Sequence, residues 1–292
     1  MRDYIKGFFR EFEYGKEDSD ELLRAYDRIT EHPQASLLLD ECLAAYEGDV
    51  PTDFSAMISA ADRMAAYVSI HEYTAGLILF ICFSGHLEKL YSIRGIDRGI
   101  YKNSMLDLKY KLNECRAVYG IAGSFVCSWF GRFFDLTRFA LGRLQFEVIE
   151  FGEHYEKNGM ILTPETKVLN IHIPRSGERL TEEACFNSYL MAKDFFKNEI
   201  NRDPCPFVCS SYLLFPSNER FLEKGTNLYR FLKSFDVFRS RPDKGRDNLW
   251  RIFDTMEKNP DRLPRDTSLR RALADYLKNG GEMGSGRGVF FM

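Results

Sequence analysis

The sequence predicts an α + α/β protein, with an all-helical N-terminal domain followed by a mixed sheet that is flanked by helices. Three observations lead to this prediction. The chain has 292 residues, which is more than one domain usually holds. Residues 18–141 repeat apolar side chains at helical spacing, whereas short segments after Gly142 alternate apolar and polar residues with a period of two. We therefore expect a helical domain at residues 1–141 and a second domain at residues 142–292.

The N-terminal domain is expected to be built from helices alone. Apolar residues recur there every three or four positions, as at Leu38, Cys42 and Tyr46. Pro33 is placed where a helix begins, a position that proline favours. The predicted helices cover residues 18–30, 33–48, 53–70, 71–93, 97–120 and 128–142.

The second domain is expected to alternate strands with helices. In the segment 143–151, Leu144 and Phe146 share one face, while Glu147 lies on the other. Asn158-Gly159 is a dipeptide that hairpin turns favour. Strands are expected at residues 143–151, 160–163, 167–174, 207–215, 236–241, 248–254 and 286–291. Helices are expected from Thr181 and at residues 218–235 and 265–281, and the glycine-rich segment 280–288 is expected to be a helix stop with a flexible turn.

Composition and charge argue against several classes of function. The net charge is −3 and the pI is near 6.0, which disfavours nucleic acid as a partner. The most apolar run, residues 73–83, is shorter than the ~20 residues of a membrane span, so we expect a buried helix and no membrane contact. The 7 cysteines follow no visible secretion signal, so reduced thiols in the cytoplasm are expected. Cys205 and Cys209 lack a second pair at zinc spacing, so no metal is expected.

A basic loop between a strand and a helix is the most informative feature. The apolar run that begins at Leu169 stops at Pro174, and Arg175 and Arg179 follow before a helix begins at Thr181. The first N–H groups of a helix lack acceptors and carry partial positive charge, so they favour a phosphate. The plain alternative is a capped helix with solvated arginines, which the acidic residues at 182 and 183 support.

The order of elements resembles the core of the GNAT acyltransferase fold, read from its second strand onward. Residues 167–174 are similar to its fourth strand, residues 175–181 to its pyrophosphate loop and residues 207–215 to its fifth strand. A closer resemblance is to a bacterial acyltransferase family with a helical N-terminal domain and a GNAT-like C-terminal domain. It rests on the segments GRLQFE, LNIHIPRSG, LTEEAC and TSLRRAL, the last of which precedes a terminal GG. This resemblance covers essentially the whole chain. It implies acyl-CoA or coenzyme A as co-substrate, bound by Ile173, Arg175, Ser176, Gly177, Arg179, Thr181 and Ser210.

The chain departs from the GNAT pattern at two places. GNAT enzymes usually carry a Q/R-x-x-G-x-G/A loop, and here only Gly177 is present. Many members place a tyrosine shortly before a Gly-Phe pair, as the general acid for the leaving thiolate. Tyr229 is one residue from that position, and Ser234 stands where glycine is usual. The departures put the catalytic acid in question.

Four residues are candidates for catalysis. His172 shares a strand face with Asn170 beside the basic loop, and a base with a pKa near 7 suits deprotonation of an amine. Glu147 and Glu150 are rival bases, and Tyr229 is the candidate acid. Each also has a structural explanation: a hydrogen-bonded histidine, polar positions on an exposed strand, and a core or surface tyrosine.

The predicted reaction is transfer of an acyl group from acyl-CoA to an amine of a small molecule or peptide, by direct attack. The helical domain is expected to cover the acceptor side. One alternative is a non-catalytic GNAT-like module that binds acyl-CoA or a partner. A weaker one is a hydrolase that uses Cys209 or Ser211, although no G-x-S-x-G elbow surrounds them. The oligomeric state stays open.

Overall fold

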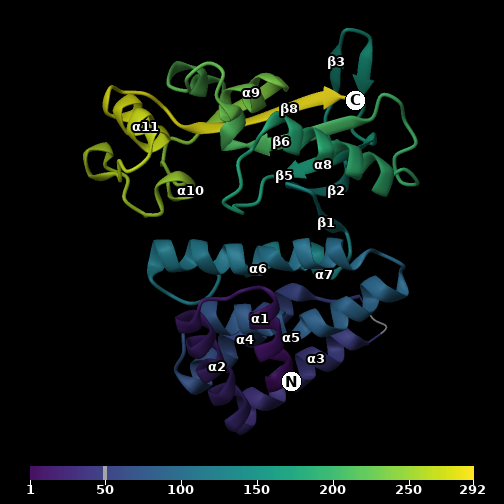
Figure 1. The fold of residues 1–292 in the computed structure, drawn as a ribbon, viewed down its shortest axis with the longest axis vertical. Coiled ribbons are helices and arrows are strands. Elements are labelled where there is room, and N and C mark those ends of the chain that lie inside the picture. Colours follow the sequence, from purple (N-terminus) through teal and green to yellow (C-terminus); the bar gives the residue numbers. More distant parts are fainter. Residues whose placement is uncertain (49–50) are drawn as a thin grey trace. The chain divides into compact units, whose positions relative to one another are not determined.

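The computed structural model describes residues 1–48 and 51–292, and its chain divides into two compact units (Figure 1). The first unit is Met1–Phe139 and the second is Ala140–Met292. The sequence placed the boundary between residues 141 and 142. The fold class is confirmed: helices build the first unit, and a mixed sheet with flanking helices builds the second.

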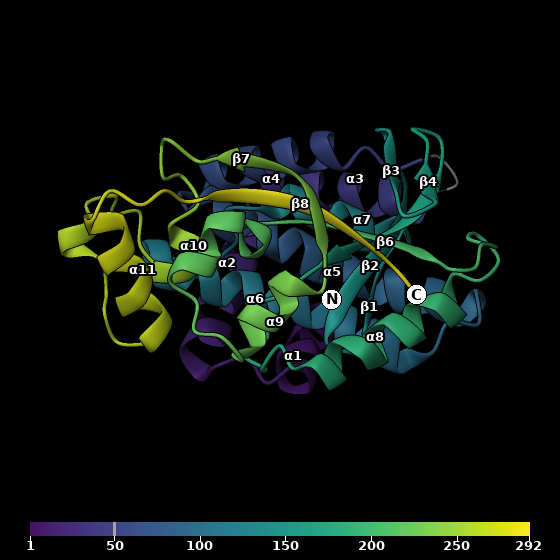
Figure 2. The same cartoon turned by 90° about the horizontal axis from the view of Figure 1, so that it is seen from above.

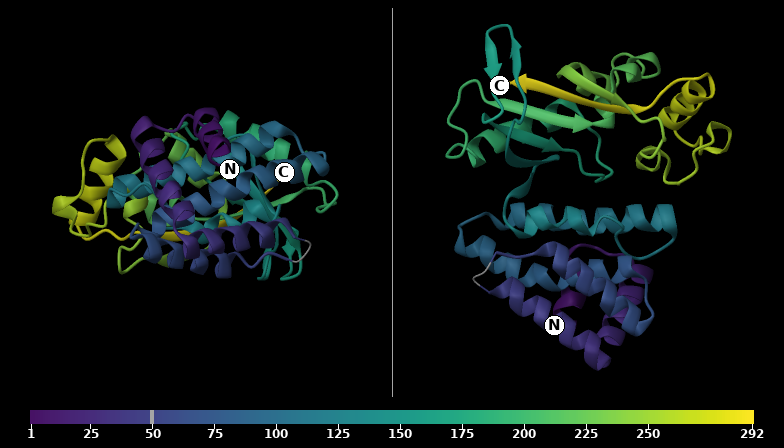
Figure 3. Two further views of the ribbon diagram at one scale, coloured as in Figure 1. Left: turned by 90° about the horizontal axis from the view of Figure 1, so that it is seen from below. Right: turned by 180° about the vertical axis from the view of Figure 1, so that it is seen from behind.

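The first unit packs its helices around one central apolar helix, α5 (Figure 3). This helix contacts α1, α2, α3, α4 and α6. Side chains of Asp53 and Asp97 cap the starts of α4 and α6, as acceptors do for unpaired N–H groups. The helix α1, rich in charge and phenylalanine, was not predicted. The elements are α1 Arg2–Glu11, α2 Lys16–Glu31, α3 Pro33–Glu47, α4 Phe54–Val68, α5 Glu72–Ile93, α6 Arg98–Tyr119, η1 Cys127–Trp129 and α7 Gly131–Phe134.

Helix α5 contains the apolar run that the sequence predicted as a buried helix. Every residue from Thr74 to Ser84 is buried. By length and composition the helix could also cross a membrane, and it is the one such helix in the described chain. Of its most apolar window, 61 % is buried inside the protein. Burial of this extent is what a core helix shows.

The predicted helix at residues 128–142 is wrong. The segment forms η1 and α7 and then enters strand β1, Arg138–Leu141. Leu136 adopts a left-handed conformation, with φ 59°, which ends the helical turns. The Asp135 carboxylate accepts a hydrogen bond from the N–H of Thr137 at 3.0 Å and stabilises this exit.

The second unit contains a six-stranded mixed sheet in the order β1-β2-β5-β6-β8-β7 (Figures 1 and 2). Strands β5 and β6 are parallel, while the pairs β2–β5, β6–β8 and β7–β8 are antiparallel. A separate hairpin, β3–β4, turns at Asn158 and Gly159, both with positive φ, as predicted. The strands are β2 Leu144–Glu150, β3 Tyr155–Lys157, β4 Met160–Leu162, β5 Lys167–His172, β6 Pro206–Ser211, β7 Asp236–Pro242 and β8 Gly284–Phe291.

The two faces of the sheet have different roles. Helix α8, Glu182–Phe195, covers one face, where the ring of Tyr189 lies 5.3 Å from Phe207 and 4.8 Å from Phe290. The other face carries a second apolar cluster that includes Val168, Val208 and Val289. Because side chains alternate along a strand, consecutive residues of one strand, such as Phe207 and Val208, lie on opposite faces of the sheet.

Three predictions for the C-terminal half were wrong in detail. The strand at 207–215 ends at Ser211 and becomes the short helix η2, Tyr212–Leu214. The helix at 218–235 is η3, Pro216–Arg220, followed by α9, Asn227–Lys233, because Gly225 adopts φ 87° and the side chain of Thr226 caps a new helix. The strand at 248–254 is the helix α10, Trp250–Phe253.

The glycine-rich segment 280–288 is largely strand, contrary to the flexible turn expected. After η4, Pro260–Arg262, and α11, Ser268–Lys278, the chain enters β8 at Gly284. A Cβ on Gly286 would collide with the carbonyl oxygen of Leu214, and one on Gly288 would lie 2.8 Å from the Cβ of Phe235. These glycines therefore let neighbouring segments approach the backbone of β8 closely.

Candidate active site

Glu147, Asn170 and His172 form a polar cluster on the sheet face opposite α8. The Nε2 atom of His172 lies 2.6 Å from Oε1 of Glu147, and Nδ2 of Asn170 lies 2.9 Å from the same oxygen. Asn170 Nδ2 and His172 Nε2 are 3.1 Å apart. Glu147 is buried, with 6 % exposure. The His172 side chain keeps 19 % exposure, so part of the ring is accessible to solvent.

The register of β2 and β5 produces this cluster. Glu147 is paired with Asn170, and Gln145 with His172. The alternation of KVLNIH places Leu169 and Ile171 toward α8 and the two polar residues on the other face. A buried carboxylate next to a histidine fixes the hydrogen of the imidazole on the nitrogen that faces the carboxylate.

The structure does not bring the other two catalytic candidates into this cluster. Glu150 pairs with Lys167 at the opposite end of β5 and is exposed. Its parity places it on the face opposite Glu147. Tyr229 is half-buried in the first turn of α9, where its N–H binds Thr226 Oγ1. Within the described chain, no hydrogen bond or ring contact joins Tyr229 to the cluster.

Strands β5 and β6 stop pairing next to the cluster. Their paired positions end at Ile171 and Cys209, although β5 continues to His172 and β6 to Ser211. On its other side β6 stays paired with β8 up to Ser211 and Gly286. The end of β6 therefore follows β8, and an opening between two parallel strands begins at the carboxyl end of β5.

Arg143 holds the loop that leaves β5. Its Nη1 donates to the carbonyl of Pro174 at 3.1 Å, and its Nε donates to the carbonyl of Glu178 at 3.2 Å. Within the loop, Ser176 Oγ accepts the N–H of Glu178 at 3.2 Å, and Gly177 has φ 81°. Arg143 was not among the residues expected at the site, because its local sequence does not show which carbonyls its side chain reaches.

The two arginines of this loop differ in their surroundings. Arg175 forms a bidentate ion pair with Asp254, in which Nη2 and Oδ2 are 2.7 Å apart. Arg179 is exposed, and among the described residues its side chain has no ion-pair or hydrogen-bond partner. Ile173 is half-buried at the end of β5.

Helix α8 begins where the loop ends, with its first N–H groups available. The side chain of Thr181 accepts the N–H of Ala184 at 3.2 Å. The N–H groups of residues 179–183 have no acceptor within the described chain. Glu182 is partly neutralised by Arg230 of α9, whose Nη1 lies 2.7 Å from Oε2. Free N–H groups at a helix start favour an anion.

A hollow of about 400 Å³ lies between α8 and α9. Its walls are mainly apolar and include Leu180, Cys185, Phe186 and Phe231. Tyr189 also lines it, and the buried hydroxyl of Tyr189 has no hydrogen-bond partner in the described chain. The hollow thus offers an apolar slot that begins at the same helix start as the free N–H groups.

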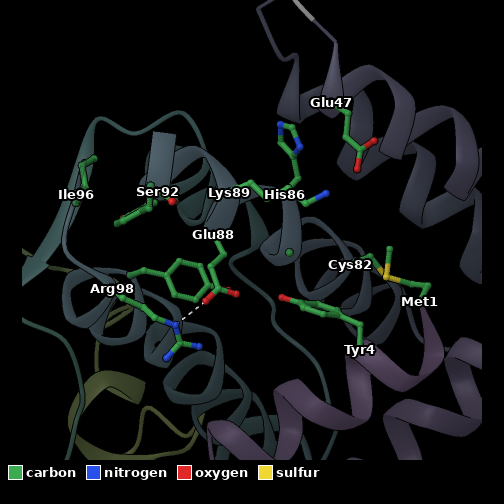
Figure 4. Close-up of a pocket in the computed structure, with 13 residues that line it drawn as sticks. Met1, Tyr4, Glu47, Cys82, His86, Glu88, Lys89, Ser92, Ile96 and Arg98 are labelled. Carbon is green, nitrogen blue, oxygen red and sulfur yellow. Dashed lines mark hydrogen bonds and ion pairs between the residues drawn. The ribbon is translucent and has the colours of Figure 1, made fainter. Parts of the chain in front are cut away.

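The helical unit has a separate hollow of about 700 Å³ (Figure 4). Tyr4 and Glu88 lie on either side of it, and Glu88 accepts from Nε of Arg98 at 2.7 Å. His86 and Glu47 lie close together along its edge.

The remaining nucleophile candidates do not form a catalytic arrangement. Cys209 is 1 % exposed, and burial raises the pKa of its thiol to about 12. Ser211 Oγ accepts the N–H of Leu213 and caps η2. Ser210 is exposed on β6 opposite Arg287. In residues 1–48 and 51–292, no group of three His, Cys, Asp or Glu side chains could hold a metal ion.

Two family models together match nearly the whole chain. Residues 3–136 match the N-acyltransferase N-terminal domain, and residues 138–290 match the GNAT-like C-terminal domain. No curated protein matches the chain.

Several solved structures share the fold. An acyltransferase in complex with decanoyl-CoA and teicoplanin superimposes with a TM-score of 0.69 at 21 % identity, covering 98 % of this chain and 87 % of that one. A mutant acyltransferase with octanoyl-CoA gives a TM-score of 0.70 at 20 % identity, covering 99 % and 88 %. An acyltransferase with CoA and 10C-teicoplanin gives 0.67 at 21 % identity, covering 98 % and 87 %.

Proposed function

The chain belongs to the acyltransferases that join an N-acyltransferase N-terminal domain to a GNAT-like C-terminal domain, and on that premise we propose that it transfers an acyl group from acyl-CoA to an amine. The observation that carries the proposal is the pair of the buried Glu147 with the partly exposed His172, beside the opening between β5 and β6. An amine must lose a proton to attack a thioester, and a positioned imidazole can take it.

His172 is the proposed base in this reaction. With the ring hydrogen on Nε2, which lies 2.6 Å from Oε1 of Glu147, Nδ1 would take the proton of the amine, directly or through one water. The amine nitrogen bonds to the thioester carbon, the carbon–sulfur bond breaks, and CoA leaves as a thiolate that is protonated by solvent or a general acid. Glu147 stabilises the imidazolium that forms. Tyr229 stays a candidate for the acid.

The loop and hollow around α8 are the proposed CoA site. The phosphates would lie at the N–H groups of residues 179–183, with Arg175 and Arg179 beside them. The hollow between α8 and α9 would hold apolar parts of the cofactor. Gly177 is already in the left-handed conformation that allows close approach of a ligand to the backbone.

The acceptor is proposed to be an amine of a small molecule or peptide. Structures with the same fold hold decanoyl-CoA or octanoyl-CoA, and two hold teicoplanin or 10C-teicoplanin. These ligands belong to those proteins, and they supply reasonable first probes for this one. A medium-chain acyl-CoA and a panel of primary amines form the starting set.

The test measures release of free thiol from decanoyl-CoA, with and without each amine. Release that depends on the amine supports the transferase. Release without an amine would indicate a hydrolase, and binding of acyl-CoA without release would indicate a non-catalytic module. Formation of the amide, followed by mass spectrometry, establishes that the acyl group reaches the amine.

A further inference from the structure

The sheet face that carries His172 has an apolar end and a polar end. The apolar end includes a valine from each of β5, β6 and β8, namely Val168, Val208 and Val289. Because every second residue of a strand lies on the same face, His172 of β5, Ser210 of β6 and Arg287 of β8 also lie on this face. Ser210 is paired with Arg287, and Arg287 is paired with Arg239 of the edge strand β7 (Figure 2). A row of polar side chains therefore runs from His172 to Arg239.

This row is open to solvent along its length. Its residue on β6, Ser210, is exposed and has a short side chain. The side chain of His172 keeps 19 % exposure and that of Arg239 keeps 66 %. Neighbouring strands are about 4.8 Å apart, so the backbones of His172 and Arg287 are separated by roughly 10 Å or more. Since an arginine side chain is long, a molecule of a few bonds in length can extend from the imidazole to a guanidinium.

Glu153 joins the two arginines at the far end of the row. Nη1 of Arg287 lies 2.8 Å from Oε1 of Glu153, and Nη2 of Arg239 lies 2.8 Å from Oε2. Arg287 also donates from Nη2 to the carbonyl of Phe151 at 2.7 Å, and its guanidinium lies over the ring of Phe151. Arg287 therefore holds Glu153 in place, and Glu153 in turn orients the more exposed Arg239.

The three charged groups keep one positive charge, because two guanidiniums share a single carboxylate. The neighbouring charged side chains along β7 comprise two cations and two carboxylates, which offset each other: Lys157, Asp236, Arg241 and Asp243. Among the described residues, Glu153 is the one hydrogen-bond or ion-pair partner of Arg239. A guanidinium has five N–H donors, so Arg239 can bind Glu153 and a second carboxylate together.

The two ends of the row differ in charge. The carboxylate of Glu147 lies against His172 at one end, and the excess guanidinium charge lies at the other. An acceptor amine reaches the protein mainly as an ammonium, which favours the end with Glu147. A carboxylate on the same molecule would favour the arginine end, and complementary charges of this kind fix the orientation of a ligand.

We propose that the acceptor carries a carboxylate as well as its amine, as an amino acid or a short peptide does, and that Arg239 binds this carboxylate. The proposal rests on the proposed function, since it takes His172 as the base that receives the amine. It assigns the choice of acceptor to Arg239, while Glu153 and Arg287 position its guanidinium.

Matched pairs of amines test the proposal. Each pair contains a dipeptide or an ω-amino acid and its amide, such as glycylglycine and glycylglycinamide, so that the carboxylate is the main difference. Thiol release from decanoyl-CoA gives kcat and KM for each amine with the wild type and with Arg239→Gln. Arg220→Gln is the control, because it removes an exposed arginine of η3 from the same unit. Circular dichroism checks the fold of each variant.

We expect the wild type to prefer the carboxylate member by about ten- to a hundredfold in kcat/KM, the effect of a charge-assisted hydrogen bond. Arg239→Gln should remove most of this preference through a higher KM, because the contact forms when the acceptor binds. The amides and the control should be unaffected.

Three results would overturn the inference: no carboxylate preference in the wild type, an intact preference in Arg239→Gln, or an equal loss for both members of a pair. Each of them leaves the transferase itself standing, because thiol release still depends on the amine. If none of the amines supports thiol release, the proposed function fails and the inference fails with it.

Discussion

His172 and Glu147 lie on neighbouring antiparallel strands, and Nε2 of the imidazole is 2.6 Å from Oε1 of the carboxylate. The carboxylate is buried, while the imidazole is partly exposed. In the proposed mechanism the glutamate orients the ring and the ring takes the proton of the amine, which is the order of roles in many acid–base sites. It distinguishes two residues that the sequence offered only as rivals.

Replacement of His172 should affect chemistry and spare CoA binding. We expect His172→Ala to lower turnover by roughly 10²–10⁴, the contribution of a positioned general base. Turnover is followed by thiol release with an accepted amine, and CoA affinity by calorimetry. His154→Ala is the control, because it removes an exposed histidine from the same unit. Wild-type turnover in His172→Ala would mean that the histidine is structural.

Two glutamates on β2 offer a matched comparison. Glu147→Gln keeps the shape but removes the charge that fixes the imidazole and stabilises its protonated form, so we expect turnover to fall by at least about tenfold. Glu150→Gln should leave turnover unchanged, because Glu150 is exposed at the far end of the strand pair. If Glu150→Gln lowered turnover more than Glu147→Gln did, Glu150 would replace His172 as the candidate base.

The faces of the strands could be predicted from sequence, but contacts between distant segments could not. Alternation in KVLNIH is enough to place Asn170 and His172 together, because parity along a strand is fixed. Pairing of His172 with Glu147 needs the register of β2 and β5, which depends on the chain between them. The Arg175–Asp254 pair joins residues 79 apart in sequence. Asp254 directly follows α10, which had been predicted as a strand.

The predicted helix boundaries were wrong where the backbone conformation of a single residue ended the helix despite the periodic apolar pattern. Leu136 and Gly225 both have positive φ, and each ends a helical pattern that the apolar spacing alone would continue. Gly225 carried a local signal for a break, but a leucine does not indicate a left-handed turn. At β8 the glycines reflected close packing against η2 and β7, a property of the fold that the sequence alone does not reveal.

Removal of both loop arginines should weaken CoA binding. In Arg175→Ala/Arg179→Ala we expect affinity to fall about ten- to a hundredfold, since a charge-assisted bond contributes roughly 1.5–3 kcal/mol. Calorimetry with CoA measures this, and circular dichroism checks the fold. Lys197→Ala is the control, because Lys197 is an exposed cation beyond the other end of α8. Unchanged affinity would mean that the loop is an ordinary turn before a capped helix and does not bind a phosphate.

The cysteine on β6 should be dispensable. Burial raises the pKa of Cys209 to about 12, so the thiolate that a nucleophile needs is nearly absent at neutral pH. We expect Cys209→Ala to keep turnover within about twofold, because its buried thiol acts as a small apolar group. A loss of turnover with intact CoA binding, together with an acyl-enzyme detected by mass spectrometry, would instead support a thiol mechanism.

The β3–β4 hairpin should be held to β7 in a pH-dependent way. Asp236 of β7 accepts hydrogen bonds from Tyr155 Oη at 2.7 Å and Lys157 Nζ at 2.6 Å. Burial acts to raise the pKa of Asp236, but Lys157 and Tyr155 outweigh it and hold the pKa below 3.8. A carboxyl group with a lowered folded-state pKa stabilises the fold above its unfolded pKa, and this contribution is lost as pH falls through the lowered value.

Asp236→Asn should therefore loosen the hairpin near neutral pH and much less in acid. The measurement is the free energy of opening of β3 and β4 amides by hydrogen exchange, compared between wild type and variant in a series from pH 7 down to about pH 2, because the contribution is lost only as pH falls through the lowered pKa. Asp194→Asn is the control, because Asp194 is a highly exposed carboxylate on α8 whose pair with Lys197 is solvent-screened. A difference between wild type and Asp236→Asn that is as large in acid as at neutral pH would show that packing, and not the ionised carboxylate, joins the hairpin to β7.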